Sequence, residues 1–92
     1  MSGAVTRDLS IINVKGLHAR ASAKFVDVVE RFDAQAQVEK DGMSVSGDSI
    51  MGLLMLTAPR GSQIRVTTTG PQAAALADAL EALVGDFFGE GM

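Results

Sequence analysis

The sequence predicts an α+β fold of two layers, in which a four-stranded antiparallel sheet carries three helices on one face. Segments with an apolar residue at every second position indicate strands, and segments with apolar residues at helical spacing indicate helices. These segments follow one another in the order β-α-β-β-α-β-α, without an internal repeat or a linker. Because 92 residues suffice for one modest core and not for two, we expect a single domain over residues 1–92.

The first strand and the first helix are predicted from two different periods. Leu9 and Ile11 alternate with polar residues in phase with Val5, which predicts a strand that ends near Asn13. From about Ala19 onward, apolar residues recur at helical spacing with charged residues between them. The apolar positions of this predicted helix are Ala21, Phe25, Val28, Val29 and Phe32.

A hairpin and a short helix are predicted in the middle of the chain. Alternating residues at 35–39 and 43–46 flank the dipeptide Asp41-Gly42, which is a strong signal for a two-residue turn. The segment after Ser49 is apolar on nearly every side and predicts a short helix with Ser49 near its N-cap. Its expected core residues are Leu53 and Leu56.

The last strand and the last helix complete the predicted order. Ile64, Val66 and Thr68 alternate with polar residues, which predicts a strand. The dipeptide Gly70-Pro71 then opens a helix whose first turn is set by the proline. One apolar stripe on this helix is formed by Leu76, Leu80, Leu83, Val84 and Phe87. The Gly-rich tail from residue 89 to residue 92 is the one low-complexity segment.

Composition and charge exclude several classes of function. The absence of cysteine removes disulfide scaffolds, thiolate metal sites and thiol nucleophiles. The net charge is −3 and the eight Lys and Arg residues are scattered, whereas nucleic-acid binders concentrate basic residues. No apolar run could serve as a secretory signal or cross a bilayer. We therefore expect a cytoplasmic protein that is not inserted in a membrane, does not bind nucleic acid and docks transiently onto other proteins, most simply as a monomer.

The single histidine, His18, lies in the loop between the first strand and the first helix, at or next to the helix N-cap. The first backbone N–H groups of a helix lack partners, so the amides of Ala19 and Arg20 are expected to stabilise a bound anion. A neutral imidazole is a nucleophile near pH 7, and the Arg20 guanidinium can pair with phosphate oxygens. The position of Gly16 would let the loop leave the ring exposed. These residues predict phosphoryl transfer through His18.

Other interpretations of His18 are weaker. A surface or capping histidine is the usual role of a lone His, but the context of His18, at a helix start beside Arg20, favours phosphoryl transfer instead. Metal binding needs more ligands than one His and no Cys provide, so we expect no metal and no cofactor. A Ser-His hydrolase is also disfavoured: Ser22 lies one helical turn after His18, but no acidic residue in this motif is placed to orient the ring.

Two motifs resemble those of a known family. The segment GLHAR at residues 16–20 looks like the active-site signature of the histidine-containing phosphocarrier HPr of the bacterial phosphoenolpyruvate-dependent phosphotransferase system. The segment SIMGL at residues 49–53 looks like that family's second signature, around a regulatory serine. The similarity runs over about residues 5–84, and it implies the HPr fold, an open-faced β-sandwich.

The resemblance also implies roles for individual residues. His18 would be phosphorylated on Nδ1 by phosphorylated Enzyme I and would pass the group to an Enzyme IIA-type protein, with Arg20 steadying the phosphate. The protein would be a stoichiometric carrier rather than an enzyme. The family usually has Pro directly after this Arg, where the present chain has Ala21. Proline there pre-sets the entry to the helix but gives no hydrogen bond to phosphate, so the substitution bears on loop rigidity rather than on the chemistry.

Ser49 and its neighbours carry a second hypothesis. In relatives of this type a bifunctional kinase/phosphorylase phosphorylates the corresponding serine, which stops acceptance at the histidine; plain helix capping is the alternative for Ser49. A phosphate there would add nearly two negative charges beside Asp48 and oppose docking of partners on the apolar patch that follows. The expected partner contacts are Leu17, Lys24, Ile50, Met51 and Leu54.

A different class of function remains open on the sequence alone. The same scaffold could be a regulatory interaction module that works without phosphorylation, with His18 incidental, because a fold does not fix a function. Incubation with Enzyme I and phosphoenolpyruvate distinguishes the two. Neither the sugar-uptake branch nor the nitrogen-related regulatory branch is favoured by the residues.

Overall fold

The computed structural model describes residues 3–90, and its elements follow the predicted order. The strands are β1 (Val5–Ser10), β2 (Gln35–Lys40), β3 (Met43–Ser46) and β4 (Gln63–Thr69). The helices are α1 (Ala19–Glu30), α2 (Ile50–Met55) and α3 (Ala73–Gly85), followed by the 3₁₀ turn η1 (Phe87–Gly89). The predicted sequence β-α-β-β-α-β-α is confirmed.

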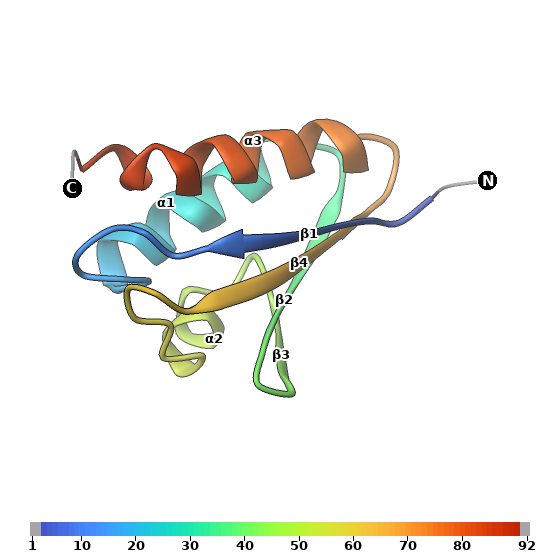
Figure 1. The fold of residues 1–92 in the computed structure, drawn as a ribbon. Helices are drawn as coiled ribbons and strands as arrows, with labels where there is room; N and C mark the ends of the chain where they lie inside the picture. Colours follow the sequence, from blue (N-terminus) through green and yellow to red (C-terminus); the bar gives the residue numbers. More distant parts are fainter. Residues whose placement is uncertain (1–2, 91–92) are drawn as a thin grey trace.

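The four strands form one antiparallel sheet with the order β1-β4-β2-β3. The register places apolar residues opposite each other, with Leu9 facing Ile64 and Val38 facing Val66. Helices α1 and α3 lie across one face of this sheet, and α2 packs beside α1 and β3 (Figure 1). The other face carries polar residues, so the fold is the open-faced α+β sandwich that the sequence predicts.

The core lies between the sheet and the helices and is almost entirely aliphatic. Phe25 of α1 is fully buried at its centre. Leu53 and Leu56 are buried as predicted and attach the short helix α2 to this core. Other buried members of the cluster are Leu9, Ile11, Val38, Ile64, Val66, Leu76, Leu80 and Val84.

Three boundaries differ from the prediction. Strand β1 ends at Ser10 rather than near Asn13, because Ile11 leaves the β4 ladder and bonds to the turn at residues 61–62. Helix α1 ends at Glu30, before the predicted apolar position Phe32. Helix α3 begins at Ala73, so Pro71 lies before the first turn and does not form it.

The end of the predicted stripe on α3 is also wrong by one residue. The chain leaves the α-helix after Gly85, and Phe87 and Phe88 have positive φ angles of 56° and 54°. This turn buries Phe88 completely and leaves Phe87 only half-buried. A helical stripe cannot predict the exchange, because the backbone is no longer helical at these residues.

After this turn the chain continues past the end of α3 and lies beside the beginning of α1, at the same end of the molecule as the loop after β1 (Figure 1). Residues 89 and 90 of the Gly-rich tail are therefore part of the folded structure, while residues 91 and 92 lie outside the described part. Within residues 3–90, no helix is long and apolar enough to cross a membrane.

Candidate functional site

His18 is the N-cap residue of α1, and its imidazole makes the capping hydrogen bond. The residue has extended backbone angles, φ −78° and ψ −177°, which are typical of an N-cap. Its ring Nδ1 accepts a hydrogen bond from the backbone N–H of Arg20 at 3.2 Å. The predicted position at the start of the helix is therefore confirmed, and Nδ1 is the ring atom that faces the unpaired amides.

The loop before His18 is held against the segment after α2. Gly16 has φ +66°, and a Cβ added to it would lie 2.5 Å from the Ala58 carbonyl oxygen and 2.8 Å from Pro59 Cα. The N–H of Leu17 donates to the same Ala58 carbonyl at 2.9 Å. The buried Asn13 side chain donates from Nδ2 to the Gly16 carbonyl at 2.8 Å. These contacts fix the loop that presents the ring, without the proline that the family has at position 21.

The opposite edge of the ring contacts a carboxylate from the C-terminal segment. The Nε2 atom of His18 lies 3.0 Å from Oε1 of Glu90. The second carboxylate oxygen, Oε2, lies 3.6 Å from Nε of Arg20. The side chain of Glu90 is only 14% exposed, against 21% for His18 and 65% for Arg20. Sequence reasoning found no acidic residue in the motif to orient the ring; the structure brings one from 72 residues away.

Lys24 holds this C-terminal segment in place. Its Nζ donates to the carbonyl oxygen of Phe88 at 2.7 Å. The burial of Phe88 anchors the same segment from the core side. Lys24 is thus half-buried and engaged within the molecule, although it was predicted to meet acidic partner surfaces.

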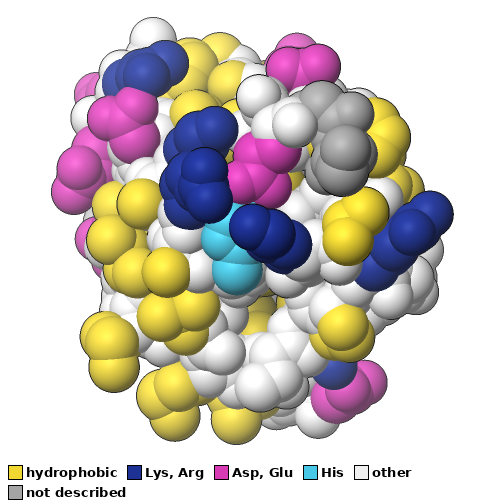
Figure 2. Space-filling model, turned by 90° about the vertical axis from the view of Figure 1, so that its left-hand side faces the viewer, with side chains coloured by type: hydrophobic (Ala, Val, Ile, Leu, Met, Phe, Trp, Pro, Cys, Tyr) yellow, Lys and Arg dark blue, Asp and Glu magenta, His cyan; other side chains and the backbone are white. Residues whose placement is uncertain are grey.

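The charges around the ring are mixed. In Figure 2 the single histidine lies at the surface between basic side chains, with an acidic side chain directly against it. The hydrogen bond with His18 lowers the pKa of Glu90 below its ordinary value, although desolvation opposes this; electrostatic attraction to His18, Arg20 and Lys24 adds to the lowering. Glu90 therefore faces the ring as a carboxylate.

Two shallow pockets adjoin His18 and share Lys15 in their walls. One pocket of ≈ 330 Å³ is lined by Lys15, Leu17, His18, Thr57, Ala58 and Pro59. The other, of ≈ 360 Å³, is lined by Val14, Lys15, Arg20, Lys24, Gly89 and Glu90. An anion on the ring would thus have Lys15 and Arg20 close by, although the sequence pattern indicated Arg20 alone.

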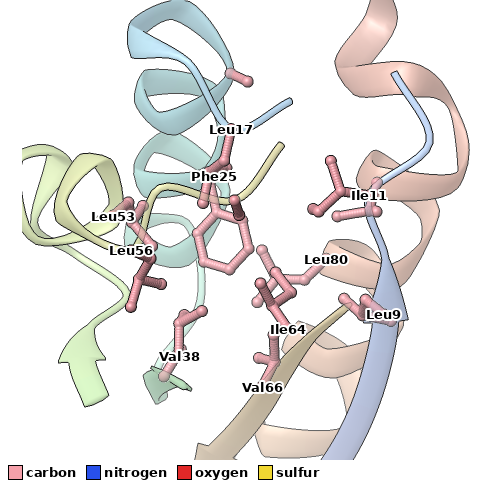
Figure 3. Packing of buried hydrophobic residues seen from close by; sticks show 14 of the residues in the cluster. Leu9, Ile11, Leu17, Phe25, Val38, Leu53, Leu56, Ile64, Val66 and Leu80 are labelled. Carbon is pink, nitrogen blue, oxygen red and sulfur yellow. The ribbon is translucent and has the colours of Figure 1, made fainter. Parts of the chain in front are cut away.

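The prediction that Leu17 is an exposed partner contact is wrong. Its side chain is 5% exposed and belongs to the core cluster, where it points toward Phe25 (Figure 3). The reason is the Gly16 conformation together with the bond from the Leu17 N–H to Ala58, which turns the Leu17 side chain inward while leaving the next residue at the surface.

The apolar patch on α2 is exposed as predicted. Ile50 is 40% and Met51 is 70% exposed, and Leu54 is half-buried. Met55, which was not singled out, is 61% exposed and extends the patch. Hydrophobic side chains also cover much of the surface beside the histidine in Figure 2.

Ser49 is the N-cap of α2. Its Oγ accepts a hydrogen bond from the N–H of Gly52 at 3.0 Å, which confirms the predicted cap. Its neighbour Asp48 accepts a hydrogen bond from the Ser46 hydroxyl. The hydroxyl of Ser49 is half-buried at this helix start.

Ser22 has no role as a nucleophile in this arrangement. It is fully buried and its Oγ donates to the Leu17 carbonyl at 3.3 Å. Within residues 3–90, no group of three His, Cys, Asp or Glu side chains is arranged to hold a metal ion.

Sequence reasoning missed three residues of the site: Asn13, Lys15 and Glu90. The polarity of Asn13, at a position where the alternating pattern stops, was a usable signal for a buried side chain that braces the loop. Lys15 could have been added because it lies in the same loop as His18. Glu90 had no local signal, because its place depends on the left-handed turn after α3.

Comparisons with known proteins identify the family of this chain. Residues 5–86 match the family model described as the PTS HPr component phosphorylation site. The chain is 46% identical to the phosphocarrier protein HPr of Cupriavidus necator over 85 residues, covering 92% of this chain and 96% of the relative. It is also 46% identical to the phosphocarrier protein HPr of Pseudomonas putida over 86 residues, with the same coverage.

Solved structures give the same result for the fold. The crystal structure of HPr from Thermoanaerobacter tengcongensis superposes with a TM-score of 0.91 at 34% identity, covering 96% of this chain and 99% of that one. HPr from Bacillus anthracis superposes with a TM-score of 0.83 at 39% identity, covering 87% and 95%.

The fold, the histidine at the start of α1 and these matches define a histidine phosphocarrier. The chain belongs to the HPr family of the phosphoenolpyruvate-dependent phosphotransferase system. It is a carrier of phosphoryl groups rather than a catalyst.

Proposed function

We propose that His18 is the phosphoryl acceptor of this carrier and that Nδ1 is the atom phosphorylated. The observation that carries this proposal is the hydrogen bond from the Arg20 N–H to Nδ1, which places that nitrogen at the unpaired amides of α1. The ring is at the surface, so a donor protein can reach it.

The transfer uses the electron pair of Nδ1. In the resting state this pair accepts the Arg20 N–H, so the nitrogen carries no proton and is nucleophilic. As the N–P bond forms, the bond between phosphorus and the donor breaks and the donor leaves with the electron pair. The Arg20 N–H is released from Nδ1 and can then donate to a phosphate oxygen. The partial positive charge at the helix start stabilises the bound dianion.

Arg20 is proposed to assist through its side chain as well. Its side chain is 65% exposed, and rotation about its side-chain bonds would bring the guanidinium to an anion on the neighbouring ring. Arginine forms short, charge-assisted hydrogen bonds with phosphate oxygens and stabilises the charge that is spread over a transferring phosphoryl group. We also assign the amide of Ala19 to phosphate binding, since it begins the same helix.

Membership of the family supports Enzyme I as the donor and Enzyme IIA-type proteins as acceptors, and the cytoplasm as the place where they meet. The exposed apolar patch of Ile50, Met51 and Leu54 supports docking beside the histidine. Lys24 would contribute to the basic character of the same face. One face that meets two partners in turn is most simply served by a monomer.

The test is incubation with Enzyme I and phosphoenolpyruvate, followed by intact-mass measurement. The wild type should gain one phosphate that is lost on acid treatment, and His18→Ala should gain none. A phosphate retained by His18→Ala, or no phosphate on either protein, would contradict the proposal. The second outcome would instead favour an interaction module that works without phosphorylation.

A second proposal concerns Ser49, which we infer to be a regulatory phosphorylation site for an HPr kinase/phosphorylase. It is supported by the position of the Ser49 hydroxyl at the edge of the exposed apolar patch. A phosphate there would add negative charge beside Asp48 and oppose partner docking. Ser49→Asp should lower the rate of His18 phosphorylation, whereas Thr69→Asp, at an exposed position at the end of β4, should change it less. Equal rates in Ser49→Asp and wild type would exclude the switch.

A further inference from the structure

The two nitrogens of the His18 ring have different partners, and together these partners determine where the ring proton lies. Nδ1 accepts a hydrogen bond from a backbone N–H, which always donates. Nε2 faces the Glu90 carboxylate at 3.0 Å, which can only accept. Both contacts therefore require the same form of the neutral ring, with the proton on Nε2 and the free electron pair on Nδ1.

From this geometry we propose that Glu90 is a positioning residue for phosphoryl transfer: it holds the Nε2 proton, fixes the rotation of the imidazole and stabilises the positive charge that the ring acquires. The proposal rests on the proposed role of His18. Glu90 lies outside the residues 5–86 that match the family model, so its role follows from its contacts in this chain.

The positive charge follows from the electron count. When Nδ1 gives its pair to phosphorus while Nε2 keeps its proton, the neutral imidazole becomes an N-phosphoimidazolium. A carboxylate in hydrogen-bond contact with Nε2–H stabilises that cation, as a buried acid stabilises the imidazolium of a serine protease. In the second transfer the N–P bond breaks and its electron pair returns to Nδ1. Because Nε2 still holds its proton, a neutral imidazole leaves rather than an imidazolate.

Glu90 is built into the site rather than attached loosely at a chain end. Its side chain is 14% exposed, less than that of the histidine it contacts. The segment before it is fixed by the buried Phe88 and by the bond from Lys24 to the Phe88 carbonyl. The lowered pKa of Glu90 agrees with a carboxylate that remains charged against the ring.

The same carboxylate also lies on the edge of the basic pocket, where its charge opposes that of an incoming phosphate. The geometry decides which effect is larger. Glu90 contacts Nε2, on the far side of the ring from the attacking Nδ1, so it is closer to the developing cation than to the anion. It also approaches the Arg20 guanidinium only at 3.6 Å, through one oxygen, which leaves Arg20 free to turn to phosphate.

The test compares Glu90→Ala and Glu90→Gln with Asp86→Asn, which removes a charge from an exposed side chain in the same C-terminal segment. The rate of phosphoryl transfer from phosphorylated Enzyme I, measured by rapid quenching at subsaturating carrier, should fall about tenfold in Glu90→Ala, the range expected for one charge-assisted hydrogen bond. The fall should be smaller in Glu90→Gln, whose amide oxygen can still accept from Nε2–H. Asp86→Asn should transfer like the wild type.

Ring ¹⁵N spectra of the same unphosphorylated proteins distinguish a positioning role of Glu90 from a structural one, because they report the ring proton directly. The wild type and Asp86→Asn should show an Nε2-bound proton that exchanges slowly with water, and Glu90→Ala should lose this protection. Equal transfer rates in all four proteins, or faster transfer in Glu90→Ala, would overturn the inference while leaving His18 as the acceptor. Absence of phosphate from the wild type would instead overturn the proposed function.

Discussion

Two helices of this molecule begin with a side chain that accepts a hydrogen bond from the backbone, and only one of them is suited to carry a transferable phosphate. His18 caps α1 through Nδ1 and Ser49 caps α2 through Oγ. The capping geometry is similar, but the surroundings differ. His18 lies among Lys15, Arg20 and Glu90, whereas Ser49 lies between Asp48 and exposed apolar residues.

The difference shows that a helix N-cap becomes a phosphoryl-transfer site through what surrounds it. At α1 the loop is fixed, the ring proton has its own acceptor, and cations are near enough to stabilise an anion. At α2 a phosphate would meet a neighbouring carboxylate and would interrupt an apolar docking surface. The first arrangement favours reversible phosphoryl transfer, and the second favours a phosphate that regulates partner docking.

The largest expected effect is on stability, and substitutions of the glycines near the two caps test it. Gly16→Ala should lower the free energy of unfolding by about 2 kcal/mol or more, because φ +66° disfavours a side chain and the new Cβ would overlap the Ala58 carbonyl. Gly52→Ala, in the regular helix α2, places its Cβ 3.0 Å from Val45 Cβ and should change stability by no more than about 1 kcal/mol. Urea unfolding measures both. A Gly16→Ala protein as stable as Gly52→Ala would show that the loop before His18 is not rigid.

Arg20→Ala tests the contribution of the positive charge beside the cap of α1. We expect transfer from phosphorylated Enzyme I to slow by roughly tenfold to a hundredfold, with unfolding unchanged, because the guanidinium acts on the phosphate and not on the fold. Arg31→Ala is the matched control, since Arg31 lies at the other end of α1 and pairs with Asp27. Equal slowing in both variants would mean that net charge alone matters; an unfolded Arg20→Ala protein would show that the residue is structural.

Ser49→Ala tests the second cap by itself. The variant should lose about 1 kcal/mol of stability, because the Gly52 N–H loses its acceptor. The rate of His18 phosphorylation should stay at the wild-type value, because the cap of α2 takes no part in the transfer. Thermal unfolding and the transfer assay separate the two readouts. A slower transfer in a fully folded Ser49→Ala protein would contradict this division of roles.

The smallest expected effect is the pH dependence of the contact between Glu90 and His18. The pKa of Glu90 in the folded protein is below its ordinary value of 4.5. The contribution of this contact to stability is therefore fully present above pH 4.5 and is lost as the pH falls through the lower, folded value. The ¹³C shift of the Glu90 carboxyl carbon should show its protonation step below pH 4.5. A carboxyl protonation step centred at or above 4.5 would contradict the assignment of Glu90 as the partner of the ring.

Most of the fold and the centre of the site could be predicted because their signals are local. Alternation defines the strands, the Asp41-Gly42 turn has φ angles of 52° and 83° as the dipeptide predicts, and Ser49 caps α2. The position of His18 at the start of α1 follows from the same local pattern.

The errors arise where tertiary contacts override local rules. Leu17 lies in a loop and would be expected at the surface, but the left-handed Gly16 and the contact with Ala58 turn it into the core. Phe88 is buried instead of Phe87 because the backbone makes a left-handed turn after α3. Glu90 reaches the ring only through that left-handed turn, and no pattern within a Gly-rich tail could indicate it.

The most direct test of the account is to determine which nitrogen of His18 bears the phosphate. ¹⁵N and ³¹P spectra of the ring-labelled protein, recorded after phosphorylation by Enzyme I, identify the bonded atom. We predict Nδ1, because this nitrogen lies at the first amides of α1 while Nε2 contacts Glu90. Phosphorus bonded to Nε2 would contradict it.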